Sequence, residues 1–450
     1  MKALIIAGGN GTRMQPVTRG QHKSLMNLLG LKIIERVILG AKKAGIYEFV
    51  IVIGYRGQDI KRFIGNGEKL GISVKYVENK NWHKANGISV QIAKDYFKKE
   101  EQFVLLMSDH VFDYSTLENI QRLKLKKNEC VLAIDRNLKS VLDIEDTTKV
   151  VVKNGRVQAI NKQLENYNAF DTGMFICSPY IFEVLKKTTK MKKNSLSDGM
   201  RILAGEGKLR AFDIKGRVWS DCDTYADIKF AEKKLLISLT KSGDGVVSKL
   251  FNRKISTFIT KFLIHTSLTP NVISFAIPIL AIFTFFILAT GAYPWLLVGG
   301  LMIQFLSIVD GVDGEMARIK FMGSKWGKWI DPILDRYVDT ILIAGMAYGY
   351  WNMTGSSFIF AIAMFVILAD VLQDYMSSKF VVLTGGKLIT RDLPFKRDTR
   401  LLILAIGTIT NQILFAYIIF ILLSQYKVVN RFIAAKQITE KQIATNLQRL

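Results

Sequence analysis

The chain contains few of the residues from which disulfide frameworks and soft metal centres are built. Its 450 residues include only three cysteines and four histidines. Cys130, Cys177 and Cys222 do not have the short spacing of a metal-binding motif, and none of the four histidines belongs to one. We therefore expect the cysteines to be reduced core residues of a cytoplasmic domain, and we do not expect a zinc-type centre.

The first 240 residues also lack long apolar runs, and the N-terminus lacks the pattern of a secretory signal peptide. The chain instead opens with MKALIIAGGNGTR, which is typical of a strand that runs into a glycine loop. Beyond residue 270 apolar residues dominate. A length of 450 residues allows two or three domains, so we expect a soluble domain over 1–235 and a membrane domain over 269–428.

The apolar runs of the second half predict about six transmembrane helices. The expected spans are 270–290, 293–312, 332–352, 357–376, 399–410 and 412–426. Loops near 312–331 and 377–400 are rich in lysine and arginine, whereas the opposite short loops carry none. The positive-inside rule then predicts a multi-pass protein of the cell membrane, with both termini and the soluble domain in the cytoplasm.

Basic residues exceed acidic residues over the whole chain. Lysine and arginine number 62 and the acids 38, which gives a formal net charge of +24. We assign part of this excess to contacts with the lipid bilayer and with phosphate-bearing substrates, and the rest to a solvated lysine-rich surface. The charge therefore does not predict a nucleic-acid-binding protein.

Four aspartates lie between two apolar stretches, in the segment DGVDGEMARIKFMGSKWGKWIDPILD. Asp310 and Asp313 are three residues apart and Asp331 and Asp335 four apart, so each pair lies on one face of its own helix. Carboxylates that approach one another near a membrane are costly unless cations neutralise them, and oxygen ligands suit Mg²⁺ or Mn²⁺. The segment predicts a divalent-metal site facing a polar substrate. The alternative is that these acids cap helices or pair with the nearby lysines.

The same segment resembles the signature of the CDP-alcohol phosphotransferase family, DxxDGxxAR followed by GxxxDxxxD, with every fixed position present. Enzymes of this family move a phospho-alcohol from a CDP carrier to an acceptor hydroxyl and release CMP. The resemblance implies that Asp310, Asp313 and Asp331 hold metal, and that Asp335 is both a ligand and the general base. It also implies nucleotide contacts from Gly314, Arg318, Ser324 and Asn271.

Residues 1–235 alternate short β-branched runs with helical patterns, as in ALIIAG, FVIVIG and FVLLMSD. This rhythm predicts an α/β Rossmann-like domain with a mainly parallel sheet, whose ligands lie at the carboxyl ends of the strands. The glycines of the first loop, Gly8, Gly9 and Gly11, let backbone amides turn toward an anion, and Arg13 adds positive charge.

Together with Lys23 in QHKSLMNLLGLKIIERVI, this loop resembles the nucleotidyltransferases that activate sugar phosphates or small phospho-alcohols, particularly the cytidylyltransferases. The resemblance implies that the glycine loop and Arg13 hold the triphosphate of CTP, and that Lys23 stabilises the departing pyrophosphate. Two positions depart from the family pattern. Met14 replaces the usual Leu, and His22 stands where Pro commonly precedes the lysine.

The resemblance implies further site residues in this half. Asp109, at the end of FVLLMSD, and Asp223 are the implied metal ligands, with Asp221 as the competing choice for the second. Asn86 occupies the place where this family reads the base, and the segment 171–173 the place where it contacts the phospho-alcohol. A turn residue or a helix cap is the alternative at each position.

Between the halves, residues 236–268 alternate apolar and basic positions at helical spacing. This pattern predicts an amphipathic linker helix in the membrane interface, and 429–450 are predicted to form a basic cytoplasmic tail. Arg253 is a candidate phosphate contact, while Arg400 either faces the acceptor's phosphate or anchors a loop. Three further acids near membrane level are expected to line the helix bundle: Asp339, Asp370 and Asp374.

The two halves predict consecutive reactions, because one domain would make a CDP-alcohol and the other would consume it. Their order resembles the bifunctional family in which an inositol-phosphate cytidylyltransferase is fused to a di-inositol phosphate phosphate synthase. The expected substrates are CTP, inositol phosphate and CDP-inositol, with Mg²⁺ or Mn²⁺ as cofactor. Two alternatives remain: a lipid acceptor, which gives a phospholipid, and an N-terminal domain that only binds a nucleotide. Pairing of two copies through the membrane domain is also open.

Overall fold

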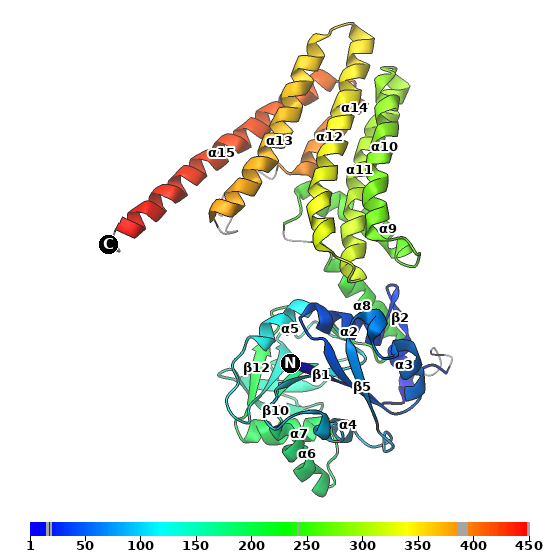
Figure 1. Ribbon diagram of the computed structural model, residues 1–450, viewed down its shortest axis with the longest axis vertical. Coiled ribbons are helices and arrows are strands. Elements are labelled where there is room, and N and C mark those ends of the chain that lie inside the picture. Colours follow the sequence, from blue (N-terminus) through cyan, green and yellow to red (C-terminus); the bar gives the residue numbers. More distant parts are fainter. Residues whose placement is uncertain (15–17, 19, 241–242, 385–394, 448–450) are drawn as a thin grey trace. The chain divides into compact units, whose positions relative to one another are not determined.

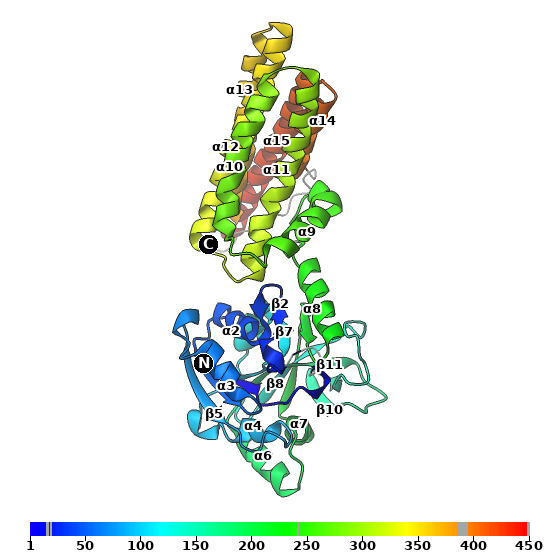
Figure 2. The same ribbon diagram turned by 90° about the vertical axis from the view of Figure 1, so that its right-hand side faces the viewer.

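The computed structural model describes residues 1–14, 18, 20–240, 243–384 and 395–447 (Figures 1 and 2). The chain forms two compact units, Met1–Ser238 and Leu239–Leu450, and each is described by itself. The first unit is an α/β domain built on one large sheet, and the second consists of helices. The predicted fold class, an α/β domain followed by a helical domain, is confirmed at this level.

The large sheet has nine strands among the described residues, in the order β5-β4-β1-β6-β11-β8-β12-β10-β9. The strands are β1 (Lys2–Ala7), β4 (Glu48–Ile53), β5 (Ser73–Glu78), β6 (Phe103–Met107), β8 (Cys130–Asp135), β9 (Lys149–Lys153), β10 (Arg156–Asn161), β11 (Ala169–Cys177) and β12 (Leu209–Asp213). The strands β5, β4, β1 and β6 pair in parallel. The predicted parallel arrangement therefore holds for the half of the sheet that contains β1.

The second half of the sheet is mixed, so the prediction of a mainly parallel sheet is wrong there. Strand β11 runs antiparallel to β6, β8 and β9, and β10 runs antiparallel to β9 and β12. Asn154 and Gly155 join β9 to β10 with φ values of 52° and 71°. Two consecutive positive φ values are typical of the tight hairpin turn that an Asn-Gly pair favours, and such a turn forces antiparallel pairing.

Helices cover both faces of the sheet (Figure 1). The helices α2 (Ile33–Lys43), α3 (Gly57–Ile64) and α5 (Tyr114–Gln121) pack on one face, and α4 (Gly87–Gln91), α6 (Tyr180–Lys190) and α7 (Leu196–Gly205) on the other. Along β1, Leu4 and Ile6 belong to one core, whereas Ala3, Ile5 and Ala7 belong to the second. Because both faces are buried, β1 reads as a continuous apolar run.

Shorter elements complete the first unit. They are the 3-10 turns Thr12–Met14, Lys23–Leu25, Glu68–Leu70 and Lys94–Tyr96, the strands β2 (Asn27–Leu28), β3 (Leu31–Lys32), β7 (His110–Phe112) and β13 (Trp219–Asp221), and helix α8 (Tyr225–Ile237). The three cysteines are buried and free, as expected of reduced core residues.

The second unit places helices at all six predicted spans. They are α10 (Pro270–Ala289), α11 (Tyr293–Ile319), α12 (Lys325–Thr354), α13 (Phe358–Thr384), α14 (Arg397–Ile409) and α15 (Ile413–Leu447). In the described part of the chain, four of them, α10, α11, α13 and α15, are long and apolar enough to cross a membrane. These four candidate transmembrane helices indicate a membrane protein.

The prediction of six spans is not confirmed for α12 and α14. Helix α14 has only 13 residues, fewer than the roughly 20 that cross a bilayer. Helix α12 has 30 residues, but its first half is highly charged. The charged residues there are Lys325, Lys328, Asp331, Asp335, Arg336 and Asp339. Contacts with α10 and α13 hold α12, and contacts with α11 and α15 hold α14.

The segment expected to be one linker helix is interrupted. A π-helical turn covers Ser248–Asn252 and leads directly into α9 (Arg253–Leu263). Gly243 and Gly245 lie upstream, where glycine disfavours a continuous helix. Helix α9 keeps the expected two-sided character, because Thr260 is fully buried while Phe258 is 62% exposed.

Glycines allow α12 to approach the backbone of α10. A Cβ at Gly345 would lie 2.9 Å from Cα of Phe285, and one at Gly349 would collide with the carbonyl oxygen of Leu288. Small residues one turn apart let two helices pack closely. The charged helix α12 therefore packs closely against α10, a candidate transmembrane helix.

Replacing Gly349 by valine should therefore lower the melting temperature of the full-length protein in detergent. A side chain at this position must displace backbone, and overpacking of this kind destabilises by about 1–3 kcal/mol. The unfolding transition followed by circular dichroism measures the effect. Gly323→Ala is the control, because a Cβ at Gly323 has no neighbour within 4 Å. Equal melting temperatures for the two variants would contradict the close contact.

Candidate active sites

The glycine loop after β1 lies against the carboxyl end of β4. The carbonyl of Gly8 accepts a hydrogen bond from the amide of Tyr55 at 3.2 Å, and Gly9 is exposed. Gly11 has a φ of 56°, and a Cβ there would lie 3.0 Å from Cδ of Lys23. Only glycine combines this left-handed backbone with so close a neighbour. The loop thus keeps exposed backbone next to Lys23.

Lys23 lies on a short 3-10 turn that neighbouring side chains hold in place. The Nδ1 atom of His22 accepts a hydrogen bond from the amide of Ser24 at 3.2 Å, and burial lowers the pKa of His22 to about 4. The hydroxyls of Ser24 and Ser108 lie 2.8 Å apart and join the turn to the end of β6. His22 stands where the family pattern has proline, and its side chain therefore also fixes the backbone at the lysine.

The ammonium of Lys23 lies between two carboxylates. It pairs with Asp109 and lies 2.7 Å from Oδ1 of Asp223, whose Oδ2 is 2.6 Å from Arg13. Burial lowers the pKa of Lys23, but the two carboxylates outweigh burial and hold it above its ordinary value. Burial raises the pKa of Asp109, but the Lys23 ammonium outweighs burial and holds it at about 2. The structure brings together these four predicted residues from distant parts of the sequence.

Asp221, the competing choice for a metal ligand, faces a different group. It pairs across strands β13 and β7 with His110, while Asp223 contacts both Lys23 and Arg13. Burial raises the pKa of the Asp221 carboxyl, although His110 partly offsets this. The geometry favours Asp223 over Asp221 as the partner of Asp109.

The residues expected to contact the base and the phospho-alcohol are partly engaged within the protein. Oδ1 of Asn86 accepts a hydrogen bond from the amide of Leu196 at 2.9 Å. In the segment 171–173, the carbonyl of Thr172 lies 3.0 Å from Nδ1 of His110. Burial raises the pKa of Asp171 to about 6. Roles in base and alcohol binding remain predictions for both positions.

Two charged residues at this site were not predicted from the sequence. Asp146 pairs with Arg13, and the ammonium of Lys162 lies 2.6 Å from the same carboxylate. Both residues lie in loops around β9 and β10, far from Arg13 in the sequence. No spacing pattern connects them to the glycine loop, so only the fold could place them there.

In the second unit, three of the four signature aspartates converge. Candidate ligand oxygens of Asp310 on α11 and of Asp331 and Asp335 on α12 all lie within 4.8 Å of one another. Asp313 lies outside this group, because its carboxylate accepts hydrogen bonds from the hydroxyl of Ser274 and the amide of Gly314. The three converging carboxylates form a candidate divalent-metal site, since carboxylate oxygens suit Mg²⁺ and Mn²⁺.

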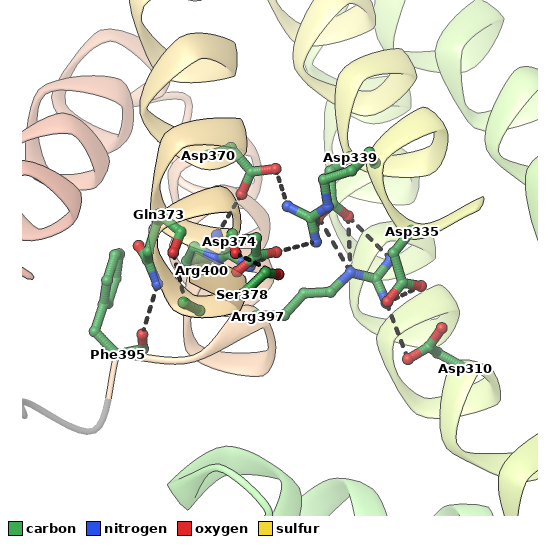
Figure 3. Close-up of polar contacts among 12 residues, drawn as sticks. Asp310, Asp335, Asp339, Asp370, Gln373, Asp374, Ser378, Phe395, Arg397 and Arg400 are labelled. Carbon is green, nitrogen blue, oxygen red and sulfur yellow. Dashed lines mark hydrogen bonds and ion pairs between the residues drawn. The ribbon is translucent and has the colours of Figure 1, made fainter. Parts of the chain in front are cut away.

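Arg397 of α14 brings a positive charge to the same site (Figure 3). One of its guanidinium nitrogens lies 2.9 Å from both Asp310 and Asp335, and its other nitrogens bond Asp339 at 3.0 and 3.1 Å. From the sequence, Arg397 is only one of several basic residues in the loop near 377–400. The signal was weak, because Arg397 lies far beyond the signature in the sequence and Lys396 beside it is also basic.

A second network of charges adjoins this site (Figure 3). Arg400 lies 2.6 Å from Asp370 and 3.5 Å from Asp374. Arg336 pairs with Asp370 and lies 3.1 Å from both Asp339 and Asp374. Asp370 and Asp374 engage the guanidinium of Arg400, which was a candidate for the acceptor's phosphate, while Asp339 pairs with Arg336 and Arg397.

Arg318 differs from these arginines because it has no acidic partner within ion-pair distance in the described residues. Among the described residues its guanidinium donates one hydrogen bond, 3.5 Å long, to the carbonyl of Leu239, and its buried Nε has no hydrogen-bond partner. A Cβ at Gly314 would lie 3.1 Å from a terminal nitrogen of Arg318. The guanidinium therefore lies over the small residue of the signature with donors available for a phosphate.

The other predicted nucleotide contacts have local roles. The hydroxyl of Ser324 caps α12 by accepting a hydrogen bond from the amide of Gly327 at 2.8 Å. Asn271 lies in the first turn of α10, and a Cβ at Gly327 would lie 4.0 Å from its Oδ1. Arg253 is bonded to Asp244 and Glu315, so its guanidinium is already engaged.

Family models match both halves of the chain. The model described as nucleotidyl transferase matches residues 2–237, and the model described as CDP-alcohol phosphatidyltransferase matches residues 267–429. The solved inositol-1-phosphate CTP transferase from T. maritima is 24% identical and covers 52% of this chain and 95% of its own, with a TM-score of 0.46.

Relatives that match almost the whole chain carry one description, "Bifunctional IPC transferase and DIPP synthase". The protein from Aquifex aeolicus is 30% identical over 438 residues, which cover 95% of this chain and 96% of that protein. The protein from Archaeoglobus fulgidus is 33% identical over 429 residues, which cover 94% of this chain and 81% of that protein.

Proposed function

Because the chain belongs to the family of bifunctional IPC transferases and DIPP synthases, we propose that it makes CDP-inositol from CTP and inositol phosphate, and then transfers the phospho-inositol group to a second inositol phosphate. Its two activities, nucleotidyl transfer and CDP-alcohol phosphatidyl transfer, correspond to the two matched regions. The observation that carries the proposal is the convergence of Asp310, Asp331 and Asp335 beside Arg397. Mg²⁺ or Mn²⁺, when bound, neutralises phosphate charge at each site.

In the first reaction, the phosphate of inositol phosphate attacks the α-phosphorus of CTP, and pyrophosphate leaves. The exposed glycine loop and Arg13 bind the triphosphate, since backbone amides and a guanidinium both donate to phosphate oxygens. Lys23 donates to the charge that develops on the leaving pyrophosphate. The residues that would hold the cation are Asp109 and Asp223, which converge on Lys23.

In the second reaction, a hydroxyl of the acceptor attacks the phosphorus that bears the inositol, and CMP leaves. Arg318 binds the pyrophosphate bridge of CDP-inositol, with Gly314 leaving room for the nucleotide. Asp335 takes the proton of the attacking hydroxyl. The residues that would hold the cation are Asp310, Asp331 and Asp335, with Asp313 beside them on α11.

The proposed domain boundaries are 1–235, 236–268, 269–428 and 429–450. We place the nucleotidyltransferase domain and both sites on the cytoplasmic side of the cell membrane, because the basic loops flank the aspartate signature. Trp326 and Trp329, at the start of α12, are 55% and 59% exposed and suit a membrane interface. CTP and CDP-inositol are charged and cytoplasmic, so this orientation supplies both sites with substrate.

Variants at the two sites should separate the two reactions. Lys23→Met should lose most CTP-dependent pyrophosphate release, because the leaving group lacks its fixed cation, and should retain transfer from supplied CDP-inositol. Asp335→Asn should do the reverse. Removing one catalytic group of this kind lowers the rate by about 10²-fold or more. Pyrophosphate and CMP release are measured on each purified full-length variant.

Several outcomes of this experiment would contradict the proposal. If both variants lost both activities while remaining folded, the two sites would not be independent. If Asp335→Asn transferred at the wild-type rate, Asp335 would not be the base. A labelled product that partitions into organic solvent would identify a lipid acceptor instead of inositol phosphate.

Cysteine labelling in intact cells tests the proposed orientation. A cysteine at Ser356 should react with an impermeant maleimide from outside, and one at Gly323 should react only after permeabilisation. Both positions are exposed and lie at opposite ends of α12, while the three native cysteines are buried and give little background. Labelling at Gly323 from outside would overturn the cytoplasmic placement of the aspartate site.

A further inference from the structure

The segment 243–263 connects to two helices of the phosphotransfer site. It lies outside both family matches, which end at residue 237 and begin at residue 267. It contains the π-helical turn and α9, and all contacts described below are within the second unit. The segment is therefore an unassigned part of the chain with direct bonds to α11 and α14.

The contact with α11 is centred on Glu315. This side chain is fully buried, and it accepts hydrogen bonds from three residues of α9. Arg253 and Ser256 each lie 2.6 Å from Oε1, and Thr260 lies 2.7 Å from Oε2. A buried carboxylate is stable only with such partners, so α9 is required to satisfy Glu315.

Glu315 is placed inside the signature that contacts the nucleotide in the proposed second reaction. It follows Gly314 directly and lies three residues before Arg318, a spacing at which a glutamate and an arginine on one helix normally pair. Here the carboxylate of Glu315 pairs with Arg253 instead. Asp244 in turn accepts two hydrogen bonds from Arg253, of 2.8 and 3.0 Å. The bonds from α9 thereby keep Arg318 available for phosphate.

The contacts with α14 are made by the residues on either side of Arg397, the arginine that bonds Asp310 and Asp335. On one side of it, Lys396 donates to the carbonyl of Gly243 at 2.5 Å. On the other side, Asp398 accepts a hydrogen bond from the amide of Ser248 at 2.7 Å. The segment thus holds both sequence neighbours of Arg397, and this fixes the first turn of α14.

We propose that residues 243–263 are a positioning element of the phosphotransfer site, in addition to joining the two domains. Through Glu315 the segment orients the turn that carries Gly314 and Arg318. Through Asp398 it orients Arg397 against the carboxylates of α11 and α12. This inference rests on the proposed second reaction, because positioning is measured through transfer from CDP-inositol.

Glu315→Gln tests the contact with α11 in the full-length protein. Glutamine keeps the shape and one acceptor oxygen but removes the charge that holds Arg253, so Arg318 should lose its orientation. We expect the KM for CDP-inositol in CMP release to rise about tenfold, which corresponds to one lost charge-assisted hydrogen bond, with a smaller change in kcat. CTP-dependent pyrophosphate release should be unchanged.

A second variant makes this result specific. Arg253→Gln combined with Glu315→Gln neutralises both partners, and the KM of the double variant should be lower than the product of the two single effects predicts. A purely structural role would reduce the amount of folded protein without moving the KM of the folded fraction. An unchanged KM in Glu315→Gln, or strictly multiplicative effects in the double variant, would overturn the role of Glu315.

A matched pair of glycine variants tests the contact with α14. A Cβ at Gly245 would collide with the carboxylate of Asp398, whereas one at Gly243 has no neighbour within 4 Å. Gly245→Ala should lower the kcat of CMP release about tenfold by displacing Asp398 and hence Arg397. Gly243→Ala should behave as wild type. Equal rates for the two variants would overturn this part of the proposal.

Failure of the positioning role can be distinguished from failure of the proposed function. If the wild-type protein released no CMP from CDP-inositol, the second reaction itself would be refuted. Suppose instead that the wild type released CMP, and that Glu315→Gln, Arg253→Gln, their double variant and Gly245→Ala all had wild-type KM and kcat values. In that case only the positioning role would be refuted. Melting temperatures of the same samples establish that each variant is folded.

Discussion

Both candidate sites depend on cations that offset carboxylates brought close together. Lys23 lies between Asp109 and Asp223 in the first unit, and Arg397 lies between Asp310 and Asp335 in the second. Like charges at such separations repel strongly away from bulk water. The chain's own cations hold each group of acids together, and in the proposed reactions divalent cations and substrate phosphates would occupy the same places.

The arginines of the second unit divide into engaged and available ones. Arg253, Arg397 and Arg400 each bond carboxylates, whereas Arg318 has no acidic partner within ion-pair distance in the described part of the chain. An available guanidinium over a glycine supports the proposal that the diphosphate of the nucleotide binds there. The engaged arginines hold helices in place. These helices include α9, which precedes the first candidate span, α10.

The sequence predicted the parts of both sites that depend on local spacing. The three- and four-residue intervals at Asp310 and Asp335 place carboxylates on single helix faces, and the glycine loop follows a recognisable first strand. Spacing could not reveal that Asp313 accepts a hydrogen bond from Ser274 and lies outside the converging group, since Ser274 lies on another helix. It also could not reveal Arg397 or Lys162, which reach their sites only through tertiary structure.

The differences between the predicted and the observed fold have similar causes. The rhythm of strands and helices predicts parallel pairing correctly up to β6, but it does not reveal the Asn154-Gly155 turn that reverses the chain after β9. Apolar runs located six helices correctly, and in the described part of the chain four of them are long and apolar enough to span a membrane. The charge in the first half of α12 and the short length of α14 set these two helices apart from the other four, because a span needs about 20 apolar residues.

The most direct test of the central claim is Mn²⁺ binding to purified full-length protein, followed by the electron paramagnetic resonance signal of free Mn²⁺. The account predicts two kinds of site, one lost in Asp331→Asn and the other in Asp109→Asn. Asp374→Asn should keep both, because Asp374 lies outside the converging group although it is a nearby carboxylate. Wild-type binding by Asp331→Asn would contradict the claim that the acids of α11 and α12 form a metal site.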